Sequence, residues 1–185
     1  MTTQKFYAII VWVMEMEKNK ELPIRKKNRL QNYDYSSCGA YFITVCTTDK
    51  RNYFWKDVGA TIGRPQDVEL SLYGKIVSDA IKNIPLVYPA LLVERYVIMP
   101  NHIHLLLRVC SDEFGRPMVA PTISRVVNQL KGYTIKQIGR PIWQKSFHDY
   151  IVRNQADYEE HINYIYYNPV RWHLDELYTE EGEAE

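Results

Sequence analysis

The sequence has few cysteines and no long apolar run. Its three cysteines, Cys38, Cys46 and Cys110, are widely spaced and form no CxxC pair. Such a set fits neither a disulfide framework nor a thiolate metal site, and it favours a reducing cytoplasm. The longest uninterrupted apolar run covers residues 6–14, fewer than the roughly 18 residues of a membrane span. Because charged residues follow it without a small-residue cleavage site, we expect neither a span nor a signal peptide.

The chain carries almost no net charge overall, although basic and acidic residues are concentrated in different parts of it. The formal net charge is +1. The last thirteen residues hold six acids and no Lys or Arg, so residues 1–172 carry 23 basic residues against 16 acidic ones. The basic residues are concentrated in residues 18–29 and 116–153. Both stretches suit a polyanionic partner and both suit simple solvation, so composition alone does not decide.

Length and composition predict one globular domain. The chain has 185 residues, of which 46% are hydrophobic and 24% charged, as in an average soluble protein with about 150 residues per domain. We predict a folded domain over residues 26–174. An N-terminal extension over residues 1–25 precedes it, and an acidic tail over residues 175–185 follows.

The hydrophobic pattern predicts an α+β fold. β-branched and aromatic runs indicate strands over residues 41–47, 91–99, 102–109 and 142–147, the middle two joined by a Pro100-Asn101 turn. Apolar residues at helical spacing indicate helices over residues 72–84, with Ser71 as N-cap, and over 123–133. A last helix over 157–168 should end at Pro169. This order matches a ferredoxin-like split βαβ antiparallel sheet with helices on one face and an extra C-terminal helix.

Two histidines on one predicted strand are the strongest chemical signal. Side chains alternate along a strand, so His102 and His104 should share one face while Ile103, Leu105 and Leu107 share the other. Beside the Pro100-Asn101 turn, the pair should lie at a sheet rim within reach of a substrate. The pattern favours half of a metal site over two hydrogen-bonded structural histidines.

The last predicted helix carries a second polar cluster. Asp157, Glu160, His161, Tyr164 and Asn168 follow three-and-four spacing along one face. We expect Tyr164 to project away from the core, one turn before Asn168, so that the hydroxyl and the amide address the same spot. An ordinary exposed tyrosine is the alternative for Tyr164 taken alone.

Three segments in order resemble the HUH single-tyrosine transposases. They are YVIMPNHIHLLL at 96–107, WQKSFHDYIVR at 143–153 and YIYYNPVRW at 164–172, and the nearest branch is that of the REP-associated tyrosine transposases. The resemblance covers residues 29–174. It implies a ferredoxin-like domain that cuts single-stranded DNA near hairpins, in a bacterial cytoplasm and at the nucleoid when bound to DNA.

The resemblance also assigns roles to residues. It implies that His102, His104 and Asn168 hold a divalent metal, Mg or Mn, and that Tyr164 is the nucleophile that forms a 5′-phosphotyrosine intermediate. The chain would act as a monomer or homodimer. DNA contacts are expected from the basic residues of both stretches, which are Arg25, Lys26, Lys27, Arg29, Arg125, Lys131, Lys136, Lys145 and Arg153.

Two other functions fit the same residues. A domesticated, noncatalytic nucleic-acid-binding protein would keep the sheet and the basic helix. A small metallohydrolase would use His102 and His104 with a third ligand such as His148 or Glu94. Cleavage that depends on Tyr164 separates the transposase from both.

Overall fold

The computed structural model describes residues 38–57, 68–110 and 122–179. Its strands are β1 (Gly39–Cys46), β2 (Leu91–Ile98), β3 (His102–Val109) and β4 (His148–Val152). Its α-helices are α2 (Leu72–Lys82), α3 (Ile84–Val87), α4 (Ile123–Ile138) and α5 (Gln155–Tyr167). Two short 3-10 helices are η1 (Thr48–Lys50) and η3 (Pro169–Leu174).

The four strands form one antiparallel sheet in the order β2-β3-β1-β4. The chain order of the elements and this strand order are those of the predicted ferredoxin-like fold, which is therefore confirmed. In the register, Cys46 of β1 lies opposite His102 of β3, and Gly39 opposite Val109. The end of β1 and the start of β3 thus meet at the same end of the sheet.

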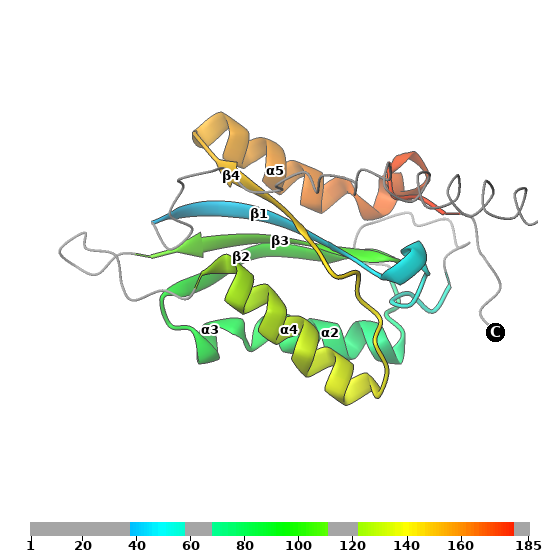
Figure 1. Cartoon of the computed structure of the whole chain (residues 1–185). Helices are drawn as coiled ribbons and strands as arrows, with labels where there is room; N and C mark the ends of the chain where they lie inside the picture. The colour runs from blue at the N-terminus through cyan, green and yellow to red at the C-terminus, as the bar shows by residue number, and fades with distance from the viewer. Residues whose placement is uncertain (1–37, 58–67, 111–121, 180–185) are drawn as a thin grey trace, which may run out of the picture. The chain divides into compact units, whose positions relative to one another are not determined.

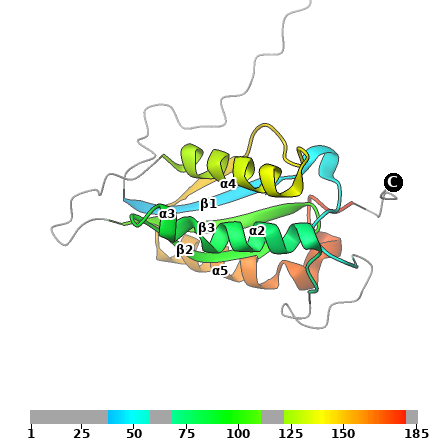
Figure 2. The same cartoon turned by 90° about the horizontal axis from the view of Figure 1, so that it is seen from below.

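Helices cover the two faces of the sheet unequally. Helices α2, α3 and α4 lie on one face, and α5 lies alone on the other (Figure 1). Seen from below, α2 and α4 run side by side in front of the strands (Figure 2). The main core lies between this pair and the sheet, and Ile103, Leu105 and Leu107 of β3 belong to it. The face of β3 that carries His102 and His104 is left for α5, as the alternation predicted.

Helix α5 packs on the sheet through a small second core. Leu106 and Ala40 of the sheet contact Ile165 of the helix, and Ile162 packs against them. Helix α2 begins where predicted, because the Ser71 hydroxyl accepts the Gly74 N–H. A side chain at Gly74 would collide with the Phe54 carbonyl, so glycine lets α2 lie directly against the segment that follows η1.

The predicted strand over residues 142–147 is wrong. That segment makes only an isolated bridge between Thr47 and Trp143, and the fourth strand starts at His148. The reason is Lys131 of α4, whose ammonium donates to the carbonyls of Gln144 at 2.8 Å and Ser146 at 2.9 Å. These two carbonyls are therefore occupied, whereas the Ile142 carbonyl still accepts the Thr48 N–H next to β1.

The remaining sequence predictions concern segments outside the described residues or the membrane. The extension over residues 1–25 lies outside the described residues. Within the part of the chain that the structure describes, no helix combines the length and apolarity that a bilayer span requires.

Lys131 gives a test of the fold. Lys131 is only 6% exposed, so Lys131→Met leaves the partly buried carbonyls of Gln144 and Ser146 without their donor. We expect a loss of about 1–3 kcal/mol in the free energy of unfolding, measured with urea. Exposed Lys136 on the same helix is the control, because Lys136→Met should change stability by less than about 0.5 kcal/mol. Equal stability of both variants would contradict this role of Lys131.

Candidate metal and tyrosine site

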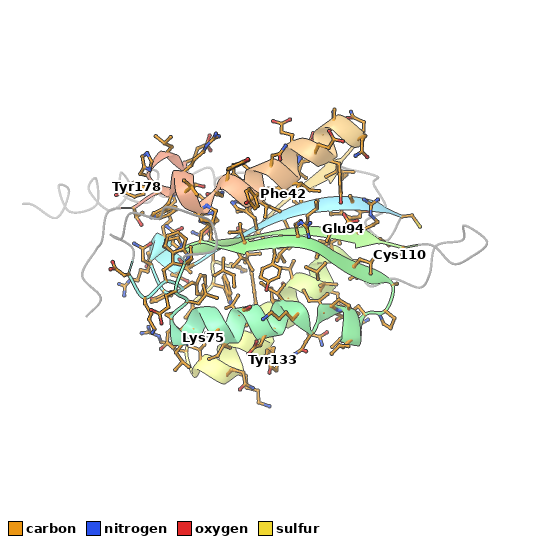
Figure 3. All side chains as sticks on the ribbon, turned by 180° about the vertical axis from the view of Figure 1, so that it is seen from behind. Phe42, Lys75, Glu94, Cys110, Tyr133 and Tyr178 are labelled. Atoms are coloured by element: carbon orange, nitrogen blue, oxygen red, sulfur yellow. The ribbon has the colours of Figure 1, made fainter. Side chains whose placement is uncertain are left out.

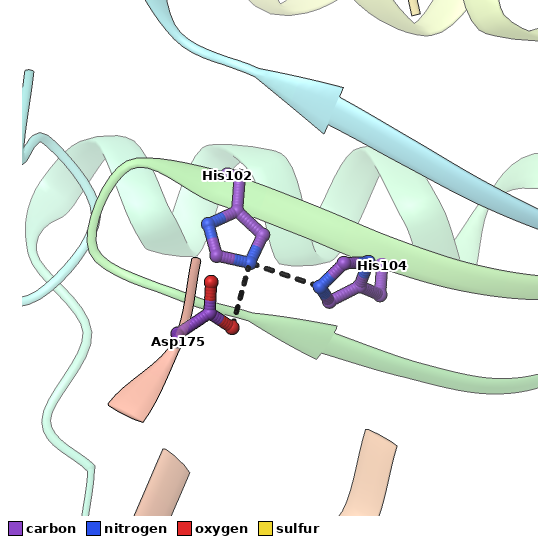
Figure 4. Close-up of side chains that lie close together, drawn as sticks. All are labelled: His102, His104 and Asp175. Carbon is purple, nitrogen blue, oxygen red and sulfur yellow. Dashed lines mark hydrogen bonds and ion pairs between the residues drawn. The ribbon is translucent and has the colours of Figure 1, made fainter. Parts of the chain in front are cut away.

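His102 and His104 lie side by side on β3 and face each other through their Nε2 atoms. The two Nε2 atoms are 2.9 Å apart (Figure 4). The exposed fraction is 0% for His102 and 3% for His104, so the expectation of a pair open to a substrate is wrong. The C-terminal end of the described chain covers them, with Trp172 against His102 and Tyr164 against His104.

The outer ring nitrogens of both histidines are held by polar neighbours. His102 Nδ1 lies 2.7 Å from Asn101 Oδ1, and His104 Nδ1 lies 2.9 Å from Thr44 Oγ1. The Asn101 amide donates through Nδ2 to the carbonyls of Lys50 and Leu177, which leaves Oδ1 as an acceptor. His102 therefore carries its proton on Nδ1 and presents a lone pair on Nε2.

The Thr44 hydroxyl can serve either tautomer of His104, since it both donates and accepts. With the proton on Nε2, His104 donates to His102 and the pair is satisfied without any ligand. With the proton on Nδ1, both Nε2 lone pairs converge on one point, where they repel unless a cation lies between them. The hydrogen bonds around the two histidines are therefore compatible with both tautomers of His104.

A carboxylate completes the cluster. Asp175 Oδ2 lies 3.9 Å from His102 Nε2, and one atom from each of His102, His104 and Asp175 falls within 4.8 Å of the others. The Asp175 side chain is 2% exposed. Its Oδ1 accepts the Leu177 N–H at 2.7 Å, and its Oδ2 accepts the Tyr164 hydroxyl at 3.3 Å.

Burial keeps both imidazoles neutral. It lowers the pKa of His102 to about 3, with a further contribution from the nearby charge of Lys50. Burial also lowers the pKa of His104 well below its usual value, and His102 adds to the effect. Because a metal ligand must be deprotonated, neutral imidazoles are ready to bind at neutral pH.

Tyr164 lies over the pair from α5. Its ring centroid is 5.1 Å from that of His104 and 5.9 Å from that of Phe42, and Figure 3 shows Phe42 between the sheet and α5. The residue is 45% exposed. As predicted, Tyr164 lies outside the main core, although its ring also contacts Phe42 and His104 on the sheet. Partial burial, followed by the charge of Asp175, raises the pKa of Tyr164 to about 12.

Asn168 follows Tyr164 by one turn, as predicted, and caps α5. Its backbone N–H donates to the Tyr164 carbonyl at 3.0 Å, and its side chain is buried. The Asn168 Nδ2 atom has no hydrogen-bond partner among the described residues. Buried polar groups normally have partners, and the Asn168 amide lies close enough to the Tyr164 hydroxyl to lower the pKa of that phenol.

Comparison with known proteins finds several relatives. No family model matches the chain. It is 27% identical to an uncharacterised protein of Haemophilus influenzae, over 90% of this chain and all of that one. It is 25% identical to a second protein of that bacterium, provisionally named a REP-associated tyrosine transposase, over 77% of each chain. It is 32% identical to a REP-associated tyrosine transposase of Escherichia coli, over 43% of this chain and 44% of that one.

A solved structure adds the fold. The structure of a REP-associated tyrosine transposase bound to a REP hairpin matches with a TM-score of 0.53 and 21% identity, over 78% of this chain and 74% of that one. The chain is related to the REP-associated tyrosine transposases. The resemblance predicted from three sequence segments is thereby confirmed. At 21% identity, the likeness to this solved structure shows a shared fold and nothing more.

In this relative of the REP-associated tyrosine transposases, the structure brings together four residues that the sequence singled out. His102, His104, Tyr164 and Asn168 lie at the same end of the sheet and α5, and Tyr164 and Asn168 line one open cleft of about 1090 Å³. His148 and Glu94, the alternative third ligands, are not in the described cluster. His148 is exposed at the start of β4, and Glu94 pairs with Arg108.

The basic residues predicted to contact DNA are scattered. Arg125 and Lys136 are exposed on α4, across the sheet from the histidines. Lys145 and Arg153 are exposed before and after β4. Lys131 was expected on the outer face of α4 but is buried, and its ammonium is used by backbone carbonyls. Arg25, Lys26, Lys27 and Arg29 lie outside the described residues.

Asp175 is the functional candidate that sequence reasoning missed. It was placed at the start of an acidic tail, seven residues after Asn168, with no periodic signal to link it to the histidines. The link is made by η3, which turns the chain back over the sheet, so that Asp175 falls beside His102. The clustered ligand set therefore contains a carboxylate in addition to the neutral groups that were expected.

Removing the charge of Asp175 tests the electrostatics of the site. We expect Asp175→Asn to lower the pKa of Tyr164 from about 12 towards the ordinary tyrosine value, because an anion beside a phenol disfavours the phenolate. NMR titration of protein labelled with ¹³C at tyrosine Cζ measures this pKa, with Tyr164→Phe to assign the resonance. Glu176→Gln is the matched control and should have a smaller effect. An unchanged Tyr164 titration in Asp175→Asn would contradict the arrangement.

Proposed function

We propose that this chain is a metal-dependent endonuclease and strand transferase that acts on single-stranded DNA near hairpins, as a transposase of the tyrosine type. Two kinds of support converge. Named relatives are REP-associated tyrosine transposases, one of them solved with a REP hairpin. The site offers a nucleophile, a proton acceptor and a set of metal ligands within one cluster.

The observation that carries the proposal is the contact between Tyr164 and the histidine cluster. Among the described tyrosines, only Tyr164 has a hydroxyl bonded to Asp175, and its ring lies against His104. Tyr150 is bonded instead to Asp157, and Tyr166 and Tyr167 contact each other. Tyr164 is therefore the hydroxyl best placed to attack a phosphate held at the histidines.

The chemistry assigns a task to each group. The Tyr164 oxygen attacks phosphorus, the bond from phosphorus to the 3′ oxygen breaks, and the 5′ phosphate stays on the tyrosine. Asp175, which accepts the Tyr164 hydroxyl, is the base within reach of the phenol proton. The 3′ hydroxyl that is released can later attack the phosphotyrosine, so strands are rejoined without an external energy source.

The donor set fits a divalent cation such as Mg or Mn. His102 and His104 would hold it through Nε2, with an Asp175 carboxylate oxygen, and the Asn168 amide is within the same site. Imidazole ligands favour Mn over Mg. When bound, such a cation supplies positive charge that polarises a phosphate oxygen and stabilises the leaving oxygen. Such a charge would oppose burial and the Asp175 carboxylate, which raise the pKa of Tyr164 to about 12.

Covalent capture of DNA tests the proposal. We expect wild-type protein, mixed with a labelled REP hairpin that carries single-stranded flanks and with Mn²⁺, to form an adduct that survives denaturing electrophoresis. Tyr164→Phe should reduce this adduct at least about 100-fold, because the nucleophilic oxygen is lost. Tyr167→Phe removes a hydroxyl one turn away in the same cleft and should leave the adduct unchanged.

The other outcomes separate the alternatives. An adduct that persists in Tyr164→Phe and disappears in Tyr167→Phe would show that Tyr167, and not Tyr164, is the nucleophile. Tight binding with no adduct under any divalent metal would favour the noncatalytic DNA-binding protein. Hydrolysis that survives loss of Tyr164 would favour the metallohydrolase.

A further inference from the structure

A second group of aromatic and basic side chains lies at the same end of the sheet as the histidines. The Arg140 guanidinium lies over the ring of Tyr53 at 5.0 Å and over the ring of Tyr73 at 5.3 Å. The two rings are 6.1 Å apart. With Lys50 and Arg51, which precede Tyr53, these residues form what we call the rim patch.

The rim patch is joined to the histidine site through the backbone. The N–H of Tyr53 donates at 2.8 Å to the carbonyl of Pro100, two residues before His102. The carbonyl of Lys50 accepts from Asn101, whose Oδ1 positions His102. Figure 3 shows Lys75, on the first turns of α2, at the end of the sheet that also carries Tyr178, with Cys110 at the opposite end. The patch and the histidines therefore lie at the same end of the sheet, with Tyr73 on α2 at the face opposite the histidines.

Among the described residues, no acid forms a salt bridge with a cation of the rim patch. Within the described part of the chain, the side chains of Lys50, Arg51 and Arg140 form no salt bridge and no hydrogen bond. The Lys50 charge nevertheless reaches the site, since it contributes to the lowered pKa of His102. Uncompensated cations beside a cleft attract phosphate.

The turn that presents Lys50 is strained. Asp49 has φ 56° and Lys50 has φ 53°, a left-handed conformation that costs energy for any residue except glycine. Such strain persists only where surrounding contacts impose it, and it is common at binding sites. The Asn101 amide binds the Lys50 carbonyl at this turn.

We propose that the rim patch binds the single-stranded DNA that flanks the cleaved phosphate. This inference rests on the proposed function and extends it. Bases would stack on the partly buried rings of Tyr53 and Tyr73 and on the Arg140 guanidinium, and the exposed Arg51 and Arg140 would contact the phosphates. The patch is distinct from the basic residues that the sequence indicated, because none of its five members was among them.

Binding without cleavage tests the rim patch. Fluorescence anisotropy in EDTA compares the full-length chain on three probes, which are a hairpin with thymidine flanks, the same hairpin without flanks, and oligothymidylate. We expect Tyr73→Leu to weaken binding of the two probes that contain single strands about tenfold, and Tyr73→Phe to restore it. Arg140→Gln should reduce the slope of log affinity against log salt by about one. Lys82→Gln, at the far end of α2, is the matched control.

The outcomes that overturn the inference are specific. Wild-type affinity in Tyr73→Leu and Arg140→Gln, equal losses on the hairpin without flanks, or no binding of either probe that contains single strands would each refute it. A loss confined to the corresponding RNA probes would refute the assignment to DNA. Patch-dependent binding without a covalent adduct would instead refute the proposed function and leave the patch intact.

Discussion

The arrangement of the site depends on the side chain of Asn101. It is 1% exposed, and its Oδ1 orients His102 while its Nδ2 binds the carbonyls of Lys50 and Leu177. One amide therefore orients His102, binds the turn after β1 and binds the segment that carries Asp175. Buried amides of this kind are costly when partly satisfied and rigid when fully satisfied.

The two faces of the sheet differ in what they carry. One face is buried in the main core, and the other carries the candidate site. Ile103, Leu105 and Leu107 bury one face of β3 under α2 and α4, while His102 and His104 occupy the other under α5. The large core can hold the strand in place, so that two imidazoles and a carboxylate can be buried without a permanent ligand. Helix α5 adds only a small apolar contact, centred on Ile165, and its main contribution is the position of Tyr164.

Features that follow from strand or helix periodicity were predictable from the sequence. Features that depend on a side chain contacting a segment distant in sequence were not. Alternation placed His102 and His104 together, and helical spacing placed Asn168 one turn after Tyr164. The strand over 142–147 failed because nothing in its composition reveals that Lys131 binds its carbonyls. Asn101 was predictable as a turn residue but not as a bridge. Asp175 was hidden because a 3-10 turn, which has no strong sequence signal, brings it to His102.

The central claim is that His102 and His104 form a metal site with Asp175. Anomalous X-ray diffraction from crystals grown with Mn²⁺ tests it most directly. The account predicts one strong peak within coordinating distance of both Nε2 atoms and of an Asp175 oxygen, and its loss in His104→Gln. Manganese bound elsewhere in the wild-type chain, with the histidines still bonded to each other, would contradict it.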